Sequence, residues 1–471
     1  MRRLAAIVFV LLSCSRPLPK GSVRSVVDRS HDGKRVLFIG LDGVDWRMVD
    51  RTMPRLSALS REGDRRVLMT QHPPLSPLVW TTMMTGVSPL EHRILDFARF
   101  NPVTREKELI TSDERAAPAI WNMATYGGKR VGVFGMWATE PPEEVNGIIV
   151  PYAHADIEDV YRSARDWISR EKPDLAVVYF QGTDEIGHLT GGDVEKARGY
   201  FRRMDDIVAD LIHLEEAEVI IASDHGFDWG GHHAVSSTDV ATAAQWHRDE
   251  GMFLHLSGAP PPSAAVAAEG RGAPPNVQQI CATLLAFLGL PRDEHLAHSI
   301  IADSNRDTVD YRRYFHRQRT TDNRQQDREA IARLKALGYI AANEPSHAPA
   351  NATSTRTPAS FNNEGLILAE RKNFDAALAA YEQALAIDPN YVSAKTNGDH
   401  AHLYRGRYRL EARDCSGALT DFQAIRTRTA LAWASIAAAE GCLGHEAAAE
   451  SAARKSLALD PNQPALRALL R

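Results

Sequence analysis

Three aspartates and three histidines between residues 42 and 247 occur in short motifs that fit metal chemistry. Asp184 and His188 are four residues apart, so on a helical turn they lie on one face and can hold one divalent ion together. A second pair, Asp224-His225, precedes Gly226, which frees the backbone turn. The full set is Asp42, Asp184, His188, Asp224, His225 and His247. Six such side chains suffice for two divalent ions with open positions for substrate and water. Any one of them taken alone is typical of a surface or capping group.

A serine near these motifs is the candidate nucleophile. Ser76 lies in the run PPLSPLVWTTMMTG (residues 73–86), directly before Pro77, which can occupy the first turn of a helix. Its hydroxyl would then sit at a helix N-terminus, where backbone N–H groups and the helix dipole favour a phosphoryl anion. Two alternatives stay open: Ser76 as a plain helix cap, and Thr81 or Thr82 as the reactive hydroxyl.

Four short apolar runs must position these residues. They span residues 36–41, 129–134, 175–180 and 219–222, and each is bounded by charged or glycine-containing turns that are typical of strand ends. Helical patterns alternate with the runs, which predicts an α/β fold with a mostly parallel central sheet and helices on both faces. Five candidate ligands follow the first, third and fourth runs, and His247 lies ahead of a further apolar run. Open α/β sheets place their sites at the carboxyl ends of strands, so we expect these side chains to lie together.

The order of the motifs resembles the alkaline phosphatase superfamily, and within it the type I phosphodiesterase and nucleotide pyrophosphatase branch. The resemblance covers residues 35–290. The matching motifs are Asp42-Gly43, Ser76 with Thr85-Gly86, Pro89 to His92, Asp184 to His188, Asp224-His225-Gly226, and His247-Arg248 with Gly251. It implies an alkaline phosphatase-like domain over residues 35–340 and a phosphoric ester hydrolase, a phosphodiesterase rather than a monoesterase.

The resemblance also implies a role for each site residue. One divalent ion would be held by Asp184, His188 and His247, and the other by Asp42, Asp224 and His225 together with Ser76. Ser76 is the expected nucleophile because it lies ten positions before Gly86, as the nucleophile does in the family. Its attack on a phosphate ester would give a phosphoseryl intermediate that water then hydrolyses. The nitrogen and oxygen donors suit Zn, with Mn as a second candidate.

Some positions depart from the family pattern. Nucleotide-specific members have Thr before Phe-Pro-Asn, whereas Ser76 precedes Pro-Leu-Val, so nucleotide selectivity is not implied. The triplet His92-Arg93-Ile94 stands near a predicted sheet edge where many relatives have His-Gly-Ile. Residues 95–113 form a stretch whose role the sequence does not reveal, and the natural substrate is equally open.

Rival readings of the same residues remain. His232, His233 and His255 are spare histidines near the last motif that could replace a ligand. A sulfatase of the same superfamily is disfavoured, because Leu78 and Trp80 stand where it needs Pro and Arg. A catalytically idle domain that serves as an interaction scaffold is the alternative from a different functional class.

The C-terminal part of the chain is predicted to be an all-helical solenoid. Residues 341–357 (AANEPSHAPANATSTRT) have the composition of an interdomain linker. Over residues 358–471, small and aromatic residues recur at the offsets of a 34-residue tetratricopeptide repeat, with copies starting at Pro358 and Ala430 and a degenerate copy between them. The repeat-ending prolines Pro389 and Pro461 are two periods plus four residues apart, which predicts a small insertion in the middle copy. We expect the repeats to bind a protein partner.

The N-terminus is predicted to be a targeting segment. Arg2 and Arg3 precede an apolar run at residues 4–12 that is too short to span a bilayer. The run ends in Leu-Leu-Ser-Cys, which resembles a bacterial lipobox in which Cys14 is lipidated; plain secretion and a cytoplasmic protein with an apolar N-terminal strand are the alternatives. Residues 15–34 then form a tether. We expect an exported protein, periplasmic or at the cell surface, that touches a membrane through this lipid anchor only.

Composition excludes several other classes. The chain has 471 residues, of which 44% are hydrophobic and 24% charged, values typical of globular domains rather than disordered or multi-span membrane chains. A net charge of -5 gives no reason to expect nucleic acid binding. Four cysteines in so long a chain exclude a disulfide scaffold.

Overall fold

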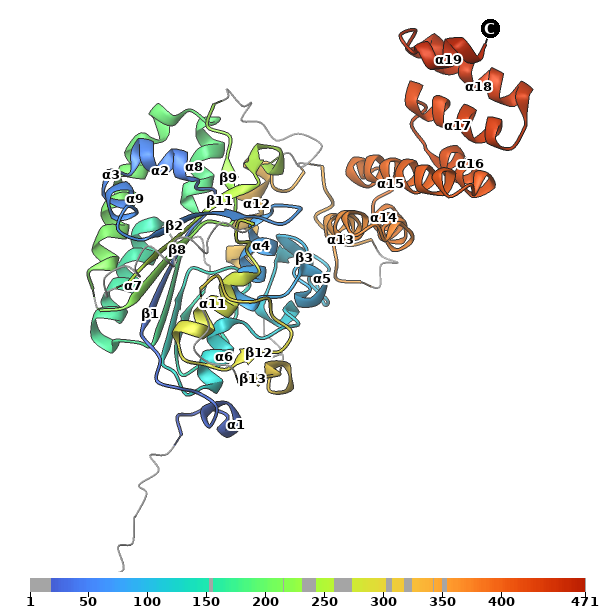
Figure 1. Cartoon of the computed structure of the whole chain (residues 1–471). Helices are drawn as coiled ribbons and strands as arrows, with labels where there is room; N and C mark the ends of the chain where they lie inside the picture. Colours follow the sequence, from blue (N-terminus) through green and yellow to red (C-terminus); the bar gives the residue numbers. More distant parts are fainter. Residues whose placement is uncertain are drawn as a thin grey trace, which may run out of the picture.

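The first domain is built around one seven-stranded sheet that lies between two layers of helices (Figure 1). The computed structural model describes residues 18–151, 156–214, 216–230, 243–257, 273–301, 307–316, 324–341, 343–349 and 354–470. In spatial order the strands are β2 (Asp64–Met69), β11 (Glu250–Leu256), β8 (Glu218–Ala222), β1 (Val36–Leu41), β7 (Leu175–Phe180), β5 (Val131–Phe134) and β6 (Gly147–Val150). From β8 to β6 every pair is parallel, and β11 is antiparallel to both neighbours. The expected fold is confirmed.

Each of the four predicted runs forms a strand. Runs 36–41 and 175–180 match β1 and β7 at both ends, run 129–134 starts two residues before β5, and run 219–222 starts one residue after β8 does. The pattern does not predict β2, because this edge strand (DRRVLM) begins with three charged residues and buries only one of its six side chains. A short, charged edge strand also protects the sheet from pairing with other chains.

The two faces of the sheet bury separate hydrophobic cores. In β1, Val36 and Phe38 face one core, while Leu37, Ile39 and Leu41 face the other, as the two-residue period of a strand requires. The first core is covered by α4 (Ser76–Thr85), α6 (Ile120–Tyr126), α11 (Gln279–Phe287) and α12 (Arg324–Ala336). The second is covered by α2 (Trp46–Thr52), α3 (Pro54–Leu59), α7 (Ile157–Glu171) and α9 (Val194–Ile212). Each large apolar side chain fully buried here contributes about 1.5–3 kcal/mol to folding.

Smaller elements complete the first domain. They are α1 (Arg24–Val27), α5 (Pro89–His92), α8 (Gly182–Thr190), and the short paired strands β3 (Ala98–Phe100) with β4 (Lys107–Leu109), β9 (Gly226–Phe227) with β10 (His247–Arg248), and β12 (Arg292–Asp293) with β13 (Thr308–Val309). Helix α8 directly follows β7, and β9 follows β8 after three residues. These connections lie at the carboxyl ends of the central strands, so the predicted ligands are brought to one edge of the sheet.

The C-terminal region is the predicted solenoid of paired helices, which extends away from the first domain (Figure 1). The pairs are α13 (Pro358–Glu370) with α14 (Phe374–Ile387), α15 (Val392–Glu411) with α16 (Cys415–Ala424), and α17 (Ala430–Cys442) with α18 (Glu446–Leu459), followed by α19 (Pro464–Leu469). A β-carbon added to Gly365 would lie 2.3 Å from the ring of Tyr381, and one added to Gly406 would lie 2.4 Å from Phe422. The repeat offsets therefore mark close helix packing. The extra length of the middle copy is helical, because α15 has 20 residues where α13 and α17 each have 13.

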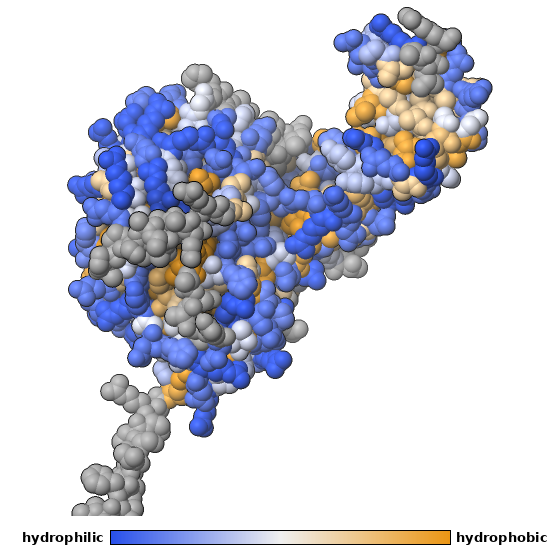
Figure 2. Space-filling view, viewed as in Figure 1, coloured by the Kyte–Doolittle hydropathy of each residue, from blue (hydrophilic) through white to orange (hydrophobic). Residues whose placement is uncertain are grey.

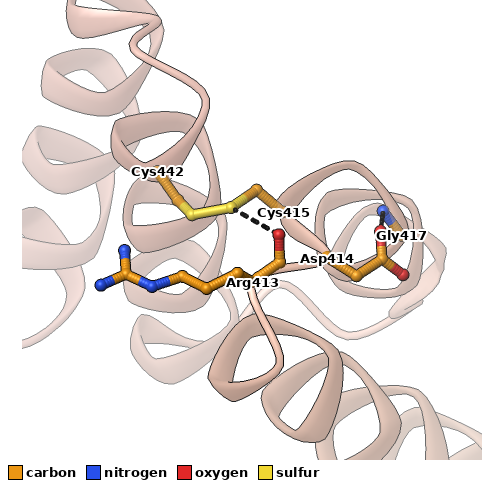
Figure 3. Close-up of a disulfide and its surroundings, with 5 residues drawn as sticks. All are labelled: Arg413, Asp414, Cys415, Gly417 and Cys442. Atoms are coloured by element: carbon orange, nitrogen blue, oxygen red, sulfur yellow. Dashed lines mark hydrogen bonds between the residues drawn. A yellow bond between two sulfur atoms is a disulfide. The ribbon is translucent and has the colours of Figure 1, made fainter.

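One disulfide links the last two pairs. Cys415 at the start of α16 is bonded to Cys442 at the end of α17, 27 residues further along the chain (Figure 3). The cysteine count alone does not predict this bond. On the face shown in Figure 2, apolar residues gather on this part of the solenoid, while the first domain is mostly hydrophilic.

The segment predicted to be a linker packs against the first domain. Glu344 and Lys107 form a buried ion pair with an N···O distance of 3.2 Å. The hydroxyl of Thr357, which is fully buried, donates to the carboxylate of Asp96. Residues 95–113, whose role the sequence does not reveal, include the β3–β4 hairpin. This hairpin and the residues just before it contact the segment that leads into the first repeat. The amino-acid composition of residues 341–357 indicates only which local backbone conformations are favoured. It cannot predict contacts with residues that are distant in the sequence.

The first repeat helix also contacts the helix that begins at Ser76. Ile367 of α13 is buried against Leu78 of α4 and against Leu95. Asn363 of α13 donates a 2.8 Å hydrogen bond to the backbone oxygen of Leu95. The solenoid is therefore fixed to the first domain close to the candidate nucleophile.

The N-terminal predictions have two outcomes. Residues 18–34 of the predicted tether pack on the first domain, because Val26 of α1 is fully buried and the Val23 N–H donates to the backbone oxygen of Tyr126 over 2.7 Å. Residues 1–17, including the predicted targeting segment and Cys14, lie outside the described residues, and so do His232 and His233. Within the described residues, no helix combines the length and the apolar character needed to cross a membrane.

Candidate active site

Three predicted ligands meet at the ends of two neighbouring strands. Asp42 follows β1, and Asp224 and His225 follow β8, which pairs with β1 in the sheet. All three are fully buried. The Nε2 atom of His225 lies 3.4 Å from Oδ1 of Asp42 and 3.3 Å from Oδ2 of Asp224. Their ligand atoms lie within 4.8 Å of one another, which is close enough to surround one ion. We call these three residues the strand half of the site.

The other three meet beside them and form the helix half of the site. Asp184 and His188 lie one turn apart in α8, as their spacing predicts, and His247 opens β10. Nε2 of His188 is 3.4 Å from Oδ2 of Asp184 and 3.3 Å from Nε2 of His247. Nε2 of His247 is 3.5 Å from Oδ1 of Asp184. All six predicted ligands are thus brought together.

Two histidines lie between the halves with defined orientations. The rings of His225 and His247 stack at a centroid distance of 3.7 Å and an angle of 15°. Nδ1 of His225 lies 3.0 Å from the backbone oxygen of Gly226, and Nδ1 of His247 lies 2.6 Å from that of Pro74. A carbonyl oxygen can only accept, so each Nδ1 carries the proton and each Nε2 presents its lone pair to the site. This is the arrangement of metal-ligating histidines.

The buried carboxylates of the site would be stabilised by a nearby positive charge. Burial raises the pKa of Asp42 well above its ordinary value, and the nearby charges of Asp224 and Asp184 raise it further. Burial likewise raises the pKa of Asp224. The pKa of His247 is lowered well below its ordinary value, chiefly by burial, so this ring stays neutral at pH 7. Crowded carboxylates next to neutral imidazoles are stabilised by a divalent cation.

Unsatisfied polar atoms give a direct test of whether this donor set fits a metal. In the part of the chain that the structure describes, Oδ1 of Asp184, Oδ2 of Asp224 and Nε2 of His225 are buried without a hydrogen-bond partner. Buried polar groups are otherwise almost always paired, so each such atom calls for an explanation. Oxygen and nitrogen donors from both halves of the site that converge in this way fit divalent metal binding.

Ser76 lies where the sequence predicts. It is the first residue of α4 and is 1% exposed, with Leu75 as the helix cap, so the capping alternative does not hold. Its Oγ donates to Oδ1 of Asp42 over 3.4 Å, which places it against the strand half. Thr82 is directed elsewhere, because its hydroxyl is 3.0 Å from Nε2 of His92, and the buried Thr81 hydroxyl has no hydrogen-bond partner within the described ranges.

Comparisons with known proteins agree with this geometry. A model of the type I phosphodiesterase / nucleotide pyrophosphatase family matches residues 36–341, and a tetratricopeptide repeat model matches residues 358–391. The first match spans well over half of the chain. The chain belongs to the type I phosphodiesterase / nucleotide pyrophosphatase family. The second match begins at Pro358, where the repeat offsets place the first copy.

Similarity to individual proteins is partial. A stretch of 93 residues is 30% identical to the 2,3-bisphosphoglycerate-independent phosphoglycerate mutase of Methanosphaera stadtmanae and covers 20% of this chain and 21% of that protein. Among solved structures, murine ectonucleotide pyrophosphatase/phosphodiesterase 5, in an inactive form with AMP, is 19% identical with a TM-score of 0.37, over 41% of this chain and 57% of that one. Phosphonoacetate hydrolase from Sinorhizobium meliloti 1021 with phosphonoformate is 17% identical with a TM-score of 0.34, over 42% and 57%. The chain therefore spans about a fifth of the curated relative and less than two thirds of these structures.

The first domain holds the predicted metal ligands with further residues that sequence reasoning missed. Oδ2 of Asp42 accepts hydrogen bonds from the Tyr179 hydroxyl and, over 3.2 Å, from Nε1 of Trp80. Trp80 is four residues after Ser76, on the same face of α4, so helical spacing could have identified it. Tyr179 lies inside the run predicted as β7. Tyr339 donates to Oδ2 of Asp184 from 155 residues away, and no local pattern marks it.

The structure also places two other residues that the sequence analysis singled out, His255 and Arg93. His255 lies on β11 and pairs with Glu218, with Nε2 2.6 Å from Oε2, so it is bound away from the six ligands. Arg93 caps the C-terminal end of α5 rather than a sheet edge, with a left-handed φ of 68°. A left-handed helix cap favours glycine, which explains why a glycine suits this position in the family.

Proposed function

We propose that this protein is an exported, metal-dependent phosphodiesterase that cleaves phosphate esters through a phosphoseryl intermediate. The observation that carries the proposal is the buried Ser76 hydroxyl at the start of α4, which donates to Asp42 of the strand half. Two groups of possible metal ligands meet at this site, Asp42 with Asp224 and His225, and Asp184 with His225 and His247. Family membership supports the reaction class. The substrate is a phosphate ester whose identity the insertions around the site determine.

The ligands divide between two ions in this proposal. Asp42, Asp224 and His225 hold one ion beside Ser76, and Asp184, His188 and His247 hold the other. Zn suits these nitrogen and oxygen donors, and Mn is the second candidate. Bound divalent ions supply charge neutralisation for the phosphoryl oxygens and lower the pKa of hydroxyl groups and water that they ligate.

The protein's own groups perform the remaining tasks. Ser76 Oγ forms the bond to phosphorus as the ester oxygen leaves, and water then cleaves the phosphoseryl bond and restores the hydroxyl. The N-terminal end of α4, a ten-residue helix that begins at Ser76, carries the positive end of the helix dipole, which favours the negative charge of a bound phosphoryl group. Hydrogen bonds from Tyr179 and Trp80 hold Asp42 so that its other oxygen faces Ser76.

Two features support an exported protein with a docking module. The targeting pattern at residues 1–14 predicts export and lipidation of Cys14. The Cys415–Cys442 disulfide is of a kind that persists in oxidising compartments. The tetratricopeptide repeats, fixed beside the site through α13, would present this phosphodiesterase domain to a protein partner.

Ser76→Ala tests the proposal. We expect the protein lacking residues 1–14, loaded with Zn, to hydrolyse bis(p-nitrophenyl) phosphate faster than p-nitrophenyl phosphate. The variant loses about 1,000-fold or more of kcat, the order that removal of a covalent nucleophile costs, while its zinc content stays near two ions per chain. Thr81→Val is the matched control, because it removes a buried hydroxyl of the same helix that makes no hydrogen bond among the described residues, and it should retain activity.

Other outcomes would contradict specific parts of the proposal. Equal loss of zinc and activity in Ser76→Ala would show that the serine acts as a ligand more than as a nucleophile. Turnover that survives in Ser76→Ala and disappears in Thr81→Val would move the nucleophile to the threonine. A wild-type protein that binds two zinc ions and hydrolyses neither ester would favour an idle scaffold for the repeats.

A further inference from the structure

A C-terminal segment of the phosphodiesterase domain reaches back to the helix half of the site. The segment comprises α12 and the residues after it up to 349, and we call it the C-terminal strap. Two of its side chains contact α8, the helix that carries Asp184 and His188. Arg333 forms an ion pair with the largely buried carboxylate of Glu185, and the Tyr339 hydroxyl donates to Oδ2 of Asp184. Neither contact is between neighbours in the sequence.

Tyr339 packs closely around the helix half. It is 5% exposed, and its ring centroid lies 5.1 Å from that of His188 and 6.2 Å from that of His247. Phe97 supports it from another side at 4.7 Å. The aromatic ring thus covers both imidazoles while the hydroxyl is directed at the carboxylate between them. This environment leaves the phenol few other rotamers.

The hydrogen bond assigns different roles to the two oxygens of Asp184. Oδ2 accepts from Tyr339 and also lies 3.4 Å from Nε2 of His188, whereas Oδ1 is 3.5 Å from Nε2 of His247 and has no hydrogen-bond partner among the described residues. A carboxylate held through one oxygen presents the other in a fixed direction. Asp42 shows the same division, since its Oδ2 accepts from Tyr179 and Trp80 while its Oδ1 faces Ser76.

We propose that Tyr339 is a positioning residue that orients Asp184 for metal binding, so that the C-terminal strap is part of the active site. This inference rests on the proposed function for its link to catalysis. Residues that hydrogen-bond a metal ligand tune the affinity of the site, and their loss typically costs 10–100-fold.

The strap is itself held on the C-terminal side of Tyr339. Beyond Tyr339, Glu344 pairs with Lys107, and the backbone N–H of Lys107 donates to the oxygen of Ser346 over 2.8 Å. Lys107 belongs to the same β3–β4 hairpin whose Phe100 donates its N–H to the backbone oxygen of Thr355, 2.6 Å away and just before the first repeat. The position of Tyr339 therefore depends on the junction with the solenoid.

Tyr339→Phe tests the inference in the complete protein, because it removes the hydroxyl and keeps the ring. Apo protein is titrated with Zn against a competing chelating dye, which resolves the affinity of each of the two ions. We expect about 10–100-fold weaker binding of one ion, unchanged binding of the other, and a loss of kcat that excess Zn restores in part while KM stays the same.

Tyr311→Phe is the matched control. Tyr311 is fully buried in the same domain and its hydroxyl donates to the backbone oxygen of Pro291 over 2.9 Å, so this variant also loses one buried hydrogen bond. Both variants should lose comparable thermal stability, and only Tyr339→Phe should lose zinc affinity. Wild-type affinity for both ions in Tyr339→Phe would overturn the inference, and so would an equal loss of affinity in the control. A zinc defect in Tyr339→Phe with no ester turnover by the wild type would uphold the positioning role and reject the proposed function alone.

Discussion

The two halves of the active site are assembled in different ways. The strand half takes Asp42, Asp224 and His225 from the ends of two strands that pair directly, so the register of the sheet already places them together. The helix half combines two residues of α8 with His247 from a separate strand pair, and it is completed by Tyr339. The strand half depends on the central core, whereas the helix half depends on contacts between segments distant in sequence. This difference predicts which substitutions affect which ion.

Asp224→Asn is expected to have the largest effect of the variants that separate the two halves. It removes an anionic ligand from the strand half, so we expect loss of one zinc ion per chain and about 1,000-fold or more of kcat, as for Ser76→Ala. The same change should stabilise the metal-free protein, because the charge of Asp224 is one cause of the raised pKa of Asp42. Zinc content and the thermal melting temperature with and without chelator provide the measurements.

The comparison between halves fails if Asp224→Asn releases both ions. His188→Ala is the complementary variant, because it removes a ligand from the helix half alone. It should release the other ion and leave the one beside Ser76 in place. Loss of both ions in each variant would show that the two halves fold and bind as one unit.

Tyr179→Phe should have a smaller effect on zinc than Tyr339→Phe has. Asp42 keeps a second donor on the same oxygen, Nε1 of Trp80 at 3.2 Å, whereas Tyr339 is the one side-chain hydroxyl that donates to Asp184 among the described residues. We expect less than about 10-fold weaker zinc binding at the strand half. Nε1 of Trp137, which donates to the Tyr179 hydroxyl over 2.9 Å, loses its acceptor, so unfolding becomes easier by about 1–3 kcal/mol. Zinc titration and denaturant unfolding measure the two effects, and a larger zinc defect than in Tyr339→Phe would contradict the proposed difference.

The same contrast explains what could be predicted from the sequence. Five of the six ligands lie in short motifs that follow apolar strands, and His247 lies just ahead of the apolar strand β11, so these signals are local. Pro77, directly after Ser76, predicts a helix start at this point, and α4 begins at Ser76 as expected. Tyr339 carries no such mark, because its role arises only when the chain folds back over 155 residues. Glu344 and Thr357 lie in a stretch whose Pro, Ala and Ser content predicts a linker, yet both are buried. Glu344 pairs with Lys107 of the distant β3–β4 hairpin, and Thr357 donates to Asp96 just before that hairpin.

Cys442→Ser should have the smallest effect on the site. The disulfide closes a 27-residue loop within the solenoid and makes no contact with the ligands, so its loss should lower solenoid stability by about 3 kcal/mol and leave ester turnover unchanged. Protein exported to an oxidising compartment and purified without residues 1–14 should show one titratable thiol after denaturation, that of the buried Cys281. Three titratable thiols per chain would show that Cys415 and Cys442 are not bonded, and the disulfide would then no longer support export. A fall in turnover that accompanies solenoid unfolding would instead show that the repeats, through α13 and the C-terminal strap, hold the helix half in its active arrangement.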